Sequence, residues 1–195
     1  MNISNNLPEV IGLAGTFAAG KDTLAWWLVE NHGFTHVSTG NLLREAAQER
    51  YGNIERPTLS QMGRELREEN GPGVLASRAL LEGRPIVISG IRAAGEAEAI
   101  KEAGGVMVFI DADPSVRYER MRTRARDEEA VLSYDNFMAR ERRELIAKDD
   151  PTDQNIGIVK GMSDIILDNS GEMLDFTNDA FNKLEQHSIK PTESE

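Results

Sequence analysis

A loop of nine residues near the amino end constrains the fold of this chain more than any other feature. It reads Gly15-Thr16-Phe17-Ala18-Ala19-Gly20-Lys21-Asp22-Thr23. Glycine lets the backbone approach an anion more closely than a residue with a Cβ, so that successive N–H groups can converge on phosphate oxygens. The lysine adds a full positive charge for the β- and γ-phosphates. The pattern therefore predicts a phosphate-binding loop.

The segments on either side of the loop support this interpretation. Val10–Ala14 is typical of a buried strand, and Leu24, Trp27 and Leu28 recur at helical spacing after the lysine. The loop then lies at a helix N-terminus, whose partial positive charge favours an anion. Asp22 stands where most such loops carry the Ser or Thr that holds Mg²⁺, and Thr23 follows it, so we expect one of these two residues to hold the metal. The residues expected to bind the nucleotide donor here are Gly15, Ala18, Ala19, Gly20, Lys21, Asp22 and Thr23.

Composition limits the partners. The chain of 195 residues is the size of one domain, and its 22 basic and 33 acidic residues give a formal net charge of −11. This acidity argues against nucleic acid or an anionic membrane as a partner. The absence of cysteine excludes disulfides and thiolate metal sites and favours a cytoplasmic location. We expect a cytoplasmic monomer or homodimer that binds small molecules.

Apolar segments alternate with helical patterns along the whole chain. Further strands are expected at 34–37, 85–89, 106–110 and 164–167. This order predicts an α/β fold of three layers, with about five parallel strands and helices on both faces. The strand ends carry the loop, the Ser38–Asn41 turn and the Gly90–Arg92 turn, which we expect to face one crevice.

Smaller patterns give local expectations. Thr58 and Gln61 have the spacing of a capping box, which predicts a helix start there. Asp113 before a proline is typical of a helix cap, although it could be proposed as a metal ligand. Trp26 and Trp27 are expected to be packing residues on the first helix. The histidines show no metal spacing, and we assign them no role.

Two segments resemble signatures of the nucleoside monophosphate kinases, with adenylate kinase as the closest pattern. Ser38-Thr39-Gly40-Asn41-Leu42-Leu43-Arg44 is similar to Ser-Thr-Gly-Asp-Leu-Leu-Arg of that family, and Gly20-Lys21-Asp22-Thr23 to its Gly-Lys-Gly-Thr. Variants with Gly-Lys-Asp-Thr resemble deoxynucleoside monophosphate kinases. The resemblance covers most of residues 9–185 and implies a P-loop kinase fold. It implies that the acceptor nucleotide binds at Thr39, Gly40 and Arg44.

A third signature matches more loosely. The family's Asp-Gly-Phe-Pro-Arg, with a glutamine four residues after the arginine, is represented by Ser89-Gly90-Ile91-Arg92 and Glu96. One residue is missing, a serine replaces an acid that helps to order Mg²⁺, and Glu96 replaces an amide that reads the base. The resemblance implies that Arg92 binds the acceptor and takes part in catalysis, and that Glu96 contacts the acceptor.

Eight arginines fall between residues 117 and 143. By the resemblance, Arg124, Arg126 and Arg140 occupy a mobile lid that supplies arginines to the transferring phosphate, which their planar fork suits. For any single arginine, a solvated helix face paired with nearby acids is the alternative. The expected single kinase domain, 1–195, has a core at about 8–186, an acceptor-binding helical region at about 38–82 and an arginine-rich lid at about 122–148.

The stretch from Ser163 to Gly171 is similar to dephospho-coenzyme A kinase near its ATP base, which implies a donor-pocket role for Asn169. Together the resemblances imply Mg²⁺-dependent transfer of the γ-phosphoryl group of ATP to a nucleoside or deoxynucleoside monophosphate. Dephospho-coenzyme A kinase, another small-metabolite kinase and a regulatory nucleotide-binding ATPase are the alternatives.

Overall fold

The computed structural model describes residues 6–124, 132–145 and 155–189. In these ranges five strands form one parallel sheet in the order β2-β3-β1-β4-β5. Their bounds are β1 Val10–Gly15, β2 Thr35–Ser38, β3 Ile86–Ile91, β4 Val106–Asp111 and β5 Ile165–Asp168. The expected sheet of about five parallel strands is confirmed.

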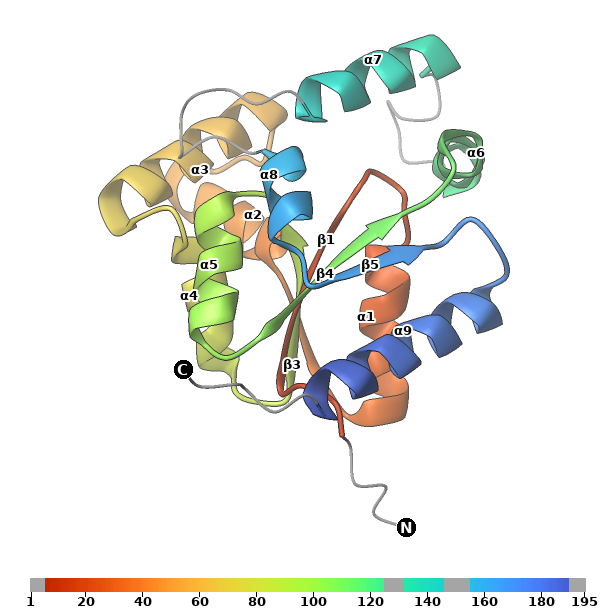
Figure 1. Ribbon diagram of the computed structural model, residues 1–195. Coiled ribbons are helices and arrows are strands. Elements are labelled where there is room, and N and C mark those ends of the chain that lie inside the picture. The colour runs from red at the N-terminus through yellow and green to blue at the C-terminus, as the bar shows by residue number, and fades with distance from the viewer. Residues whose placement is uncertain (1–5, 125–131, 146–154, 190–195) are drawn as a thin grey trace.

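Helices cover both faces of this sheet. The bounds are α1 Lys21–His32, α2 Thr39–Tyr51, α3 Arg56–Asn70, α4 Val74–Ala79, η1 Leu80–Glu82, α5 Ala94–Glu102, α6 Pro114–Arg124, α7 Tyr134–Leu145, α8 Ile156–Met162 and α9 Met173–Ile189. Helices α1 and α9 lie on one face, and α4, α5 and α8 lie on the other (Figure 1). Among the described residues, no helix combines the length and apolar character that crossing a membrane requires.

Strand β1 is buried along its whole length because β3 and β4 flank it and helices cover both of its faces. Ile11 and Leu13 pack toward α1 and α9, whereas Val10 and Ala14 pack toward α4, α5 and α8. A Cβ on Gly12 would come within 2.4 Å of the Met107 sulfur. This central strand fixes the loop that follows it.

Helices α2, α3 and α4 form a separate apolar cluster beside the sheet. Its buried members are Ala47, Met62, Leu66, Val74 and Leu75. On the surface, Arg50 of α2 pairs with Glu65 and Glu69 of α3 at 3.0 and 3.1 Å. These hydrogen-bonded carboxylates raise the pKa of Arg50 above its ordinary value. The cluster occupies the segment in which we expect the acceptor-binding region.

The structure differs from the sequence prediction at two places. The predicted capping box is wrong, because α3 already begins at Arg56 and Thr58 Oγ1 donates to Asn53 Oδ1 at 2.7 Å. Pro57 in the first turn suits this earlier start. Helix α8 was not expected, since seven residues are too few to show a clear apolar period. The cap at Asp113 is confirmed, because its Oδ1 accepts a hydrogen bond from the Ser115 N–H at 2.8 Å.

Candidate active site

A cleft of about 940 Å³ lies at the carboxyl ends of the central strands. The phosphate loop lines it from the end of β1. Ser38, Thr39 and Gly40 line it from the end of β2, and Ser89, Gly90 and Arg92 from the end of β3. The three segments that the sequence predicts to face one crevice do so.

The loop adopts dihedrals that suit an anion cradle. Gly15 and Gly20 have φ values of 145° and 100°, and Ala18 lies at 60°. A Cβ on Gly15 would lie 2.1 Å from the Ile110 carbonyl oxygen, and one on Gly20 would lie 2.2 Å from Asn169 Nδ2. Glycine is therefore required at both positions. Gly20 also leads directly into α1, so the N–H groups of the first helical turn are close to the loop.

Lys21 folds back over the loop. Its Nζ donates to the Gly15 carbonyl at 3.0 Å and to the Thr16 carbonyl at 2.7 Å. Asp22 and Thr23 line the same cleft and offer a carboxylate and a hydroxyl, the oxygen ligands that Mg²⁺ prefers. A backbone cradle, an ammonium group and two oxygen donors fit a magnesium-bound triphosphate.

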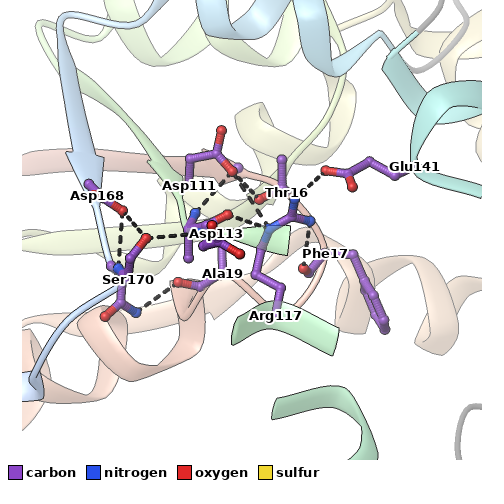
Figure 2. Close-up of polar contacts among 12 residues, drawn as sticks. Thr16, Phe17, Ala19, Asp111, Asp113, Arg117, Glu141, Asp168 and Ser170 are labelled. Atoms are coloured by element: carbon purple, nitrogen blue, oxygen red, sulfur yellow. Dashed lines mark hydrogen bonds and ion pairs between the residues drawn. The ribbon is translucent and has the colours of Figure 1, made fainter. Parts of the chain in front are cut away.

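Buried Arg117 of α6 connects the loop to two other elements (Figure 2). Its Nη2 pairs with Glu141 Oε1 of α7 at 2.7 Å, and its Nη1 donates to the Phe17 carbonyl at 3.5 Å. Its Nε donates to the Ala112 carbonyl at 2.7 Å. Asp111, at the end of β4, accepts from Thr16 Oγ1 at 2.8 Å. A solvated helix face is therefore the wrong interpretation for Arg117, which is 2% exposed.

The aromatic ring of Phe17 brings two of the expected lid arginines to the loop. The guanidinium carbon of Arg140 lies 4.8 Å from the ring centre and that of Arg124 lies 5.4 Å from it. Both side chains line the cleft. Arg126 lies outside the described residues. Two arginines from α6 and α7 thus reach the phosphate loop, and their role in transfer stays a prediction.

Asn169 lies beside the loop at the end of β5. Its Nδ2 donates to the Ala19 carbonyl at 2.8 Å, and its Oδ1 accepts from Arg120 Nη2 at 3.5 Å. Ser170 accepts from the Asp113 N–H at 2.8 Å, which ties the same turn to the start of α6 (Figure 2). Asn169 therefore supports the loop as well as lining the cleft.

The expected acceptor residues lie at the other end of the cleft. Thr39 Oγ1 donates to the Gly90 carbonyl at 2.9 Å, which joins two of the predicted segments. Gly40 lies next to it, and Arg44 donates to Asn41 Oδ1 at 2.6 Å. Arg92 lines the cleft from the turn after β3.

Glu96 is buried and bonded within the protein. Its Oε2 accepts from the backbone N–H groups of Arg92 and Ala93 at 2.9 and 3.3 Å. Its Oε1 pairs with Arg67 Nη2 at 3.4 Å. The carboxylate therefore caps α5 and compensates a buried arginine.

Comparison with known proteins identifies the family. Residues 11–146 match the AAA domain family AAA_18. The chain is 30% identical over 142 residues to a UPF0200 protein of Pyrobaculum aerophilum, covering 70% of this chain and 78% of that protein. The chain belongs to the AAA domain family and to the UPF0200 family. It is also 31% identical over 180 residues to a UPF0200/UPF0201 protein of Archaeoglobus fulgidus, covering 86% of this chain but only 52% of that protein's length.

Solved structures show that this UPF0200 chain has a P-loop kinase fold. A shikimate kinase from Acinetobacter baumannii, in complex with shikimate, matches with a TM-score of 0.62 and 18% identity, over 95% of this chain and 97% of that one. A gluconokinase from Sinorhizobium meliloti 1021 matches with a TM-score of 0.53 and 17% identity, over 93% and 94%. At this identity the likeness shows the fold alone. The finer assignment to nucleoside monophosphate kinases stays a prediction.

The cleft of this UPF0200 chain is basic although the whole chain is acidic. The basic side chains that line it are Lys21, Arg44, Arg56, Arg67, Arg92, Arg120, Arg124 and Arg140. The acidic ones are Asp22 and Glu96. Charges of one sign focused in a cleft attract ligands of the opposite sign. The lining therefore favours anionic ligands.

Several residues at the cleft have positions that the sequence does not predict. Trp26 and Trp27 were expected to be packing residues on the first helix, but Trp26 is 56% exposed and lines the cleft, while Trp27 packs against the core. Successive residues on a helix point about 100° apart, so only one of the two could face the core. His36 was assigned no role, but its Nε2 lies 2.9 Å from Ser89 Oγ. Arg67 and Arg120 also line the cleft.

Proposed function

We propose that this protein is a kinase that transfers the γ-phosphoryl group of ATP to a nucleoside or deoxynucleoside monophosphate, with Mg²⁺. The observation that carries the proposal is the single cleft in which a phosphate cradle, at Gly15–Thr23, faces the arginine-lined ends of β2 and β3. One end suits a triphosphate and the other suits a second anion. Their union in one cleft favours transfer between two phosphorylated molecules over binding of one nucleotide alone.

At the donor end, the loop N–H groups and Lys21 would hold the β- and γ-phosphates. Asn169 and Arg120 lie where the cleft continues beyond the loop, toward the turn between β5 and α9. We place the donor nucleoside on that side. Thr23 or Asp22 would hold Mg²⁺, which would neutralise charge on the phosphate oxygens.

At the acceptor end, Arg44 and Arg92 would bind the acceptor phosphate. Transfer of a phosphoryl group passes through a metaphosphate-like state that needs positioning and charge neutralisation more than acid or base catalysis. Arg124 and Arg140, which already contact Phe17 of the loop, would stabilise the equatorial oxygens. Arg140 extends from α7 to the loop, and we expect this contact also to help keep water from the reacting group.

One observation favours a second candidate, a kinase for a hydroxyl-bearing metabolite. Burial lowers the pKa of His36, although the charge of Asp22 opposes this effect, and this shift favours the neutral imidazole. It lies 2.9 Å from the hydroxyl of Ser89, which lines the cleft. A neutral imidazole could take the proton of an alcohol acceptor through this serine.

A panel of acceptors separates the candidates. ADP formation from ATP and Mg²⁺ is measured with each ribo- and deoxyribonucleoside monophosphate, with dephospho-coenzyme A, with shikimate and with gluconate. We expect ADP formation to depend on a nucleoside monophosphate and to be lost in Lys21→Ala. Lys183→Ala, which removes an ammonium group paired with Asp179 on α9, is the matched control and should retain activity.

Two results would contradict the proposal. ADP formed at the same slow rate whatever acceptor is added would indicate a regulatory ATPase. ADP formed only with a hydroxyl acceptor would favour the second candidate, and His36→Gln should then reduce that activity more than it reduces ATP binding.

A further inference from the structure

The helix turn that follows the phosphate loop carries a carboxylate whose charge is not compensated. Asp22 lies in the first turn of α1, is exposed and lines the cleft. Within the described part of the chain, no hydrogen bond or ion pair involves this carboxylate. Glu96, the other acidic residue of the cleft lining, is paired with Arg67. An uncompensated negative charge beside an anion cradle repels a triphosphate that carries no cation.

The hydroxyl of the neighbouring Thr23 lies on the β5 side of the loop. Thr23 Oγ1 is 3.9 Å from the position that a Cβ on Gly20 would occupy, and Asn169 Nδ2 is the atom nearest to that same position. Asn169 directly follows β5, which is an edge strand of the sheet. In the proposed arrangement the donor nucleoside lies on this side. Thr23 is therefore beside the phosphate nearest to the nucleoside.

Asp22 faces the opposite side of the sheet. Trp26 follows Asp22 by one helical turn and shares its helix face, and the Trp26 ring centre lies 5.5 Å from that of His36 on β2. Burial lowers the pKa of His36 and the negative charge of Asp22 opposes this effect, which shows that the carboxylate lies near the imidazole. His36 Nε2 is 2.9 Å from Ser89 Oγ of β3. Asp22 is therefore on the side of β2 and β3, where the proposed acceptor binds.

This placement makes the effect of the carboxylate depend on a cation. For transfer, the γ-phosphate must point toward the acceptor, so the triphosphate runs from the Asn169 side to the β3 side and its β- and γ-phosphates lie near Asp22. A divalent cation bridges the oxygens of these two phosphates in phosphoryl transfer. Carboxylates are preferred ligands of Mg²⁺. Asp22 is then unfavourable for a bare triphosphate and favourable for one that carries the cation.

Building on the proposed function, we propose that Asp22 makes the phosphate loop selective for a triphosphate that carries a divalent cation. Without the cation, the carboxylate repels the γ-phosphate. With the cation, the same carboxylate contributes to binding. Thr23 contacts the nucleotide in both cases, because its hydroxyl lies on the other side of the loop. The loop thereby excludes ATP that lacks the cation needed for charge neutralisation.

Calorimetric titration with a nonhydrolysable ATP analogue, adenylyl imidodiphosphate, tests this inference without any acceptor. The wild type and Asp22→Asn are each titrated in Mg²⁺ and in EDTA. We expect the ratio of the Kd in EDTA to the Kd in Mg²⁺ to fall by about 10-fold or more in Asp22→Asn, because neighbouring unit charges at a protein surface interact by more than this factor. The Kd in EDTA should itself be lower than in the wild type, since the repulsion is removed.

Three further variants make the result specific. Thr23→Val should weaken binding in both buffers and leave the ratio close to that of the wild type. Glu30→Gln removes an exposed negative charge from the same helix, so it is the matched control and its ratio should equal that of the wild type. If thermal melting shows that Asp22→Asn is unfolded, Asp22→Ser provides the same measurement and should likewise bind the analogue more tightly in EDTA.

An unchanged ratio in Asp22→Asn, or a Kd in EDTA no lower than that of the wild type, would overturn the inference. A fall of the ratio in Thr23→Val as large as that in Asp22→Asn would assign the cation to Thr23 and overturn it as well. So would a wild type that does not bind the analogue in Mg²⁺.

The two proposals fail separately. A ratio that falls in Asp22→Asn, in a protein that transfers phosphate to no acceptor, would contradict the proposed kinase and leave the role of Asp22 intact. Transfer from ATP to a nucleoside monophosphate, with the ratio unchanged in Asp22→Asn, would leave the kinase intact and remove this role from Asp22.

Discussion

The proposed donor and acceptor ends of the cleft are built in different ways. The donor end uses nine consecutive residues whose backbone forms the cradle, and Gly15 and Gly20 are fixed there by the absence of room for a Cβ. The acceptor end is assembled from side chains of α2, α3, α4 and the turn after β3. A local backbone motif keeps its geometry wherever a strand, loop and helix follow in order, whereas the acceptor end depends on how separate helices pack. Phosphate binding should therefore tolerate changes at the acceptor end.

The largest effect is expected from Lys21→Ala. Removing the ammonium group should lower the rate of phosphoryl transfer on the order of 10²–10³-fold, as loss of one transition-state donor does. The melting temperature should stay close to that of the wild type, since Lys21 is the first residue of α1 and its side chain lies at the cleft surface. Steady-state ADP formation and thermal melting provide the two readings. Full activity in this variant would remove the loop from the reaction.

Arg117→Met tests whether the donor end depends on its buried ion pair. Arg117 and Glu141 have side chains that are 3% and 10% exposed, and breaking a buried pair by removing one partner costs about 3–5 kcal/mol. The free energy of unfolding, measured by urea denaturation, should fall by about this amount. Arg50→Met, which breaks exposed pairs with Glu65 and Glu69, is the matched control and should have a small effect that shrinks in high salt. An equal loss of unfolding free energy in the two variants would contradict the claim that the buried ion pair contributes more than the exposed ones.

Arg92→Ala should separate the two ends kinetically. We expect the KM for the acceptor to rise by about 10-fold or more, because a charged hydrogen-bond partner of the phosphate is lost. The KM for ATP should stay within about twofold, since in the proposed arrangement the loop binds the donor without help from Arg92. A parallel rise in both KM values would show that the ends are not independent.

The smallest effect concerns pH. Burial lowers the pKa of His36 below its ordinary value of 6.5, so the unfolded chain binds more protons than the folded one as the pH falls below 6.5. The contribution of His36 to stability is complete above that pH and is lost below it. The melting temperature should therefore fall less between pH 7.5 and 5.5 in His36→Gln than in the wild type. An equal fall in melting temperature between pH 7.5 and 5.5 in both proteins would exclude this effect of His36.

The sequence predicts the proposed donor end because the residues that form it are consecutive in the chain. The spacing from Gly15 to Thr23, between an apolar strand and an amphipathic helix, is enough to place the loop, the first helix and the alternating α/β order. The parallel sheet follows from the repeated alternation of strands and helices.

The acceptor end is harder to predict because its contacts join residues far apart in the chain. Arg67 and Glu96 are 29 residues apart, and either could be a surface charge by sequence alone. Arg117 pairs with Glu141 because α6 and α7 come together in the fold, and no local sequence pattern predicts that contact. Trp26 is a further example. An apolar side chain on a helix is normally expected to pack in the core, and only the folded structure shows that Trp26 lies on the helix face that lines the cleft.

A crystal structure with a nonhydrolysable ATP analogue and Mg²⁺ tests the central claim most directly. We expect the β-phosphate within hydrogen-bond distance of the backbone N–H groups from Ala18 to Lys21, and Lys21 Nζ within hydrogen-bond distance of the β- and γ-phosphates. A triphosphate bound elsewhere, or none bound at saturating concentration, would contradict it.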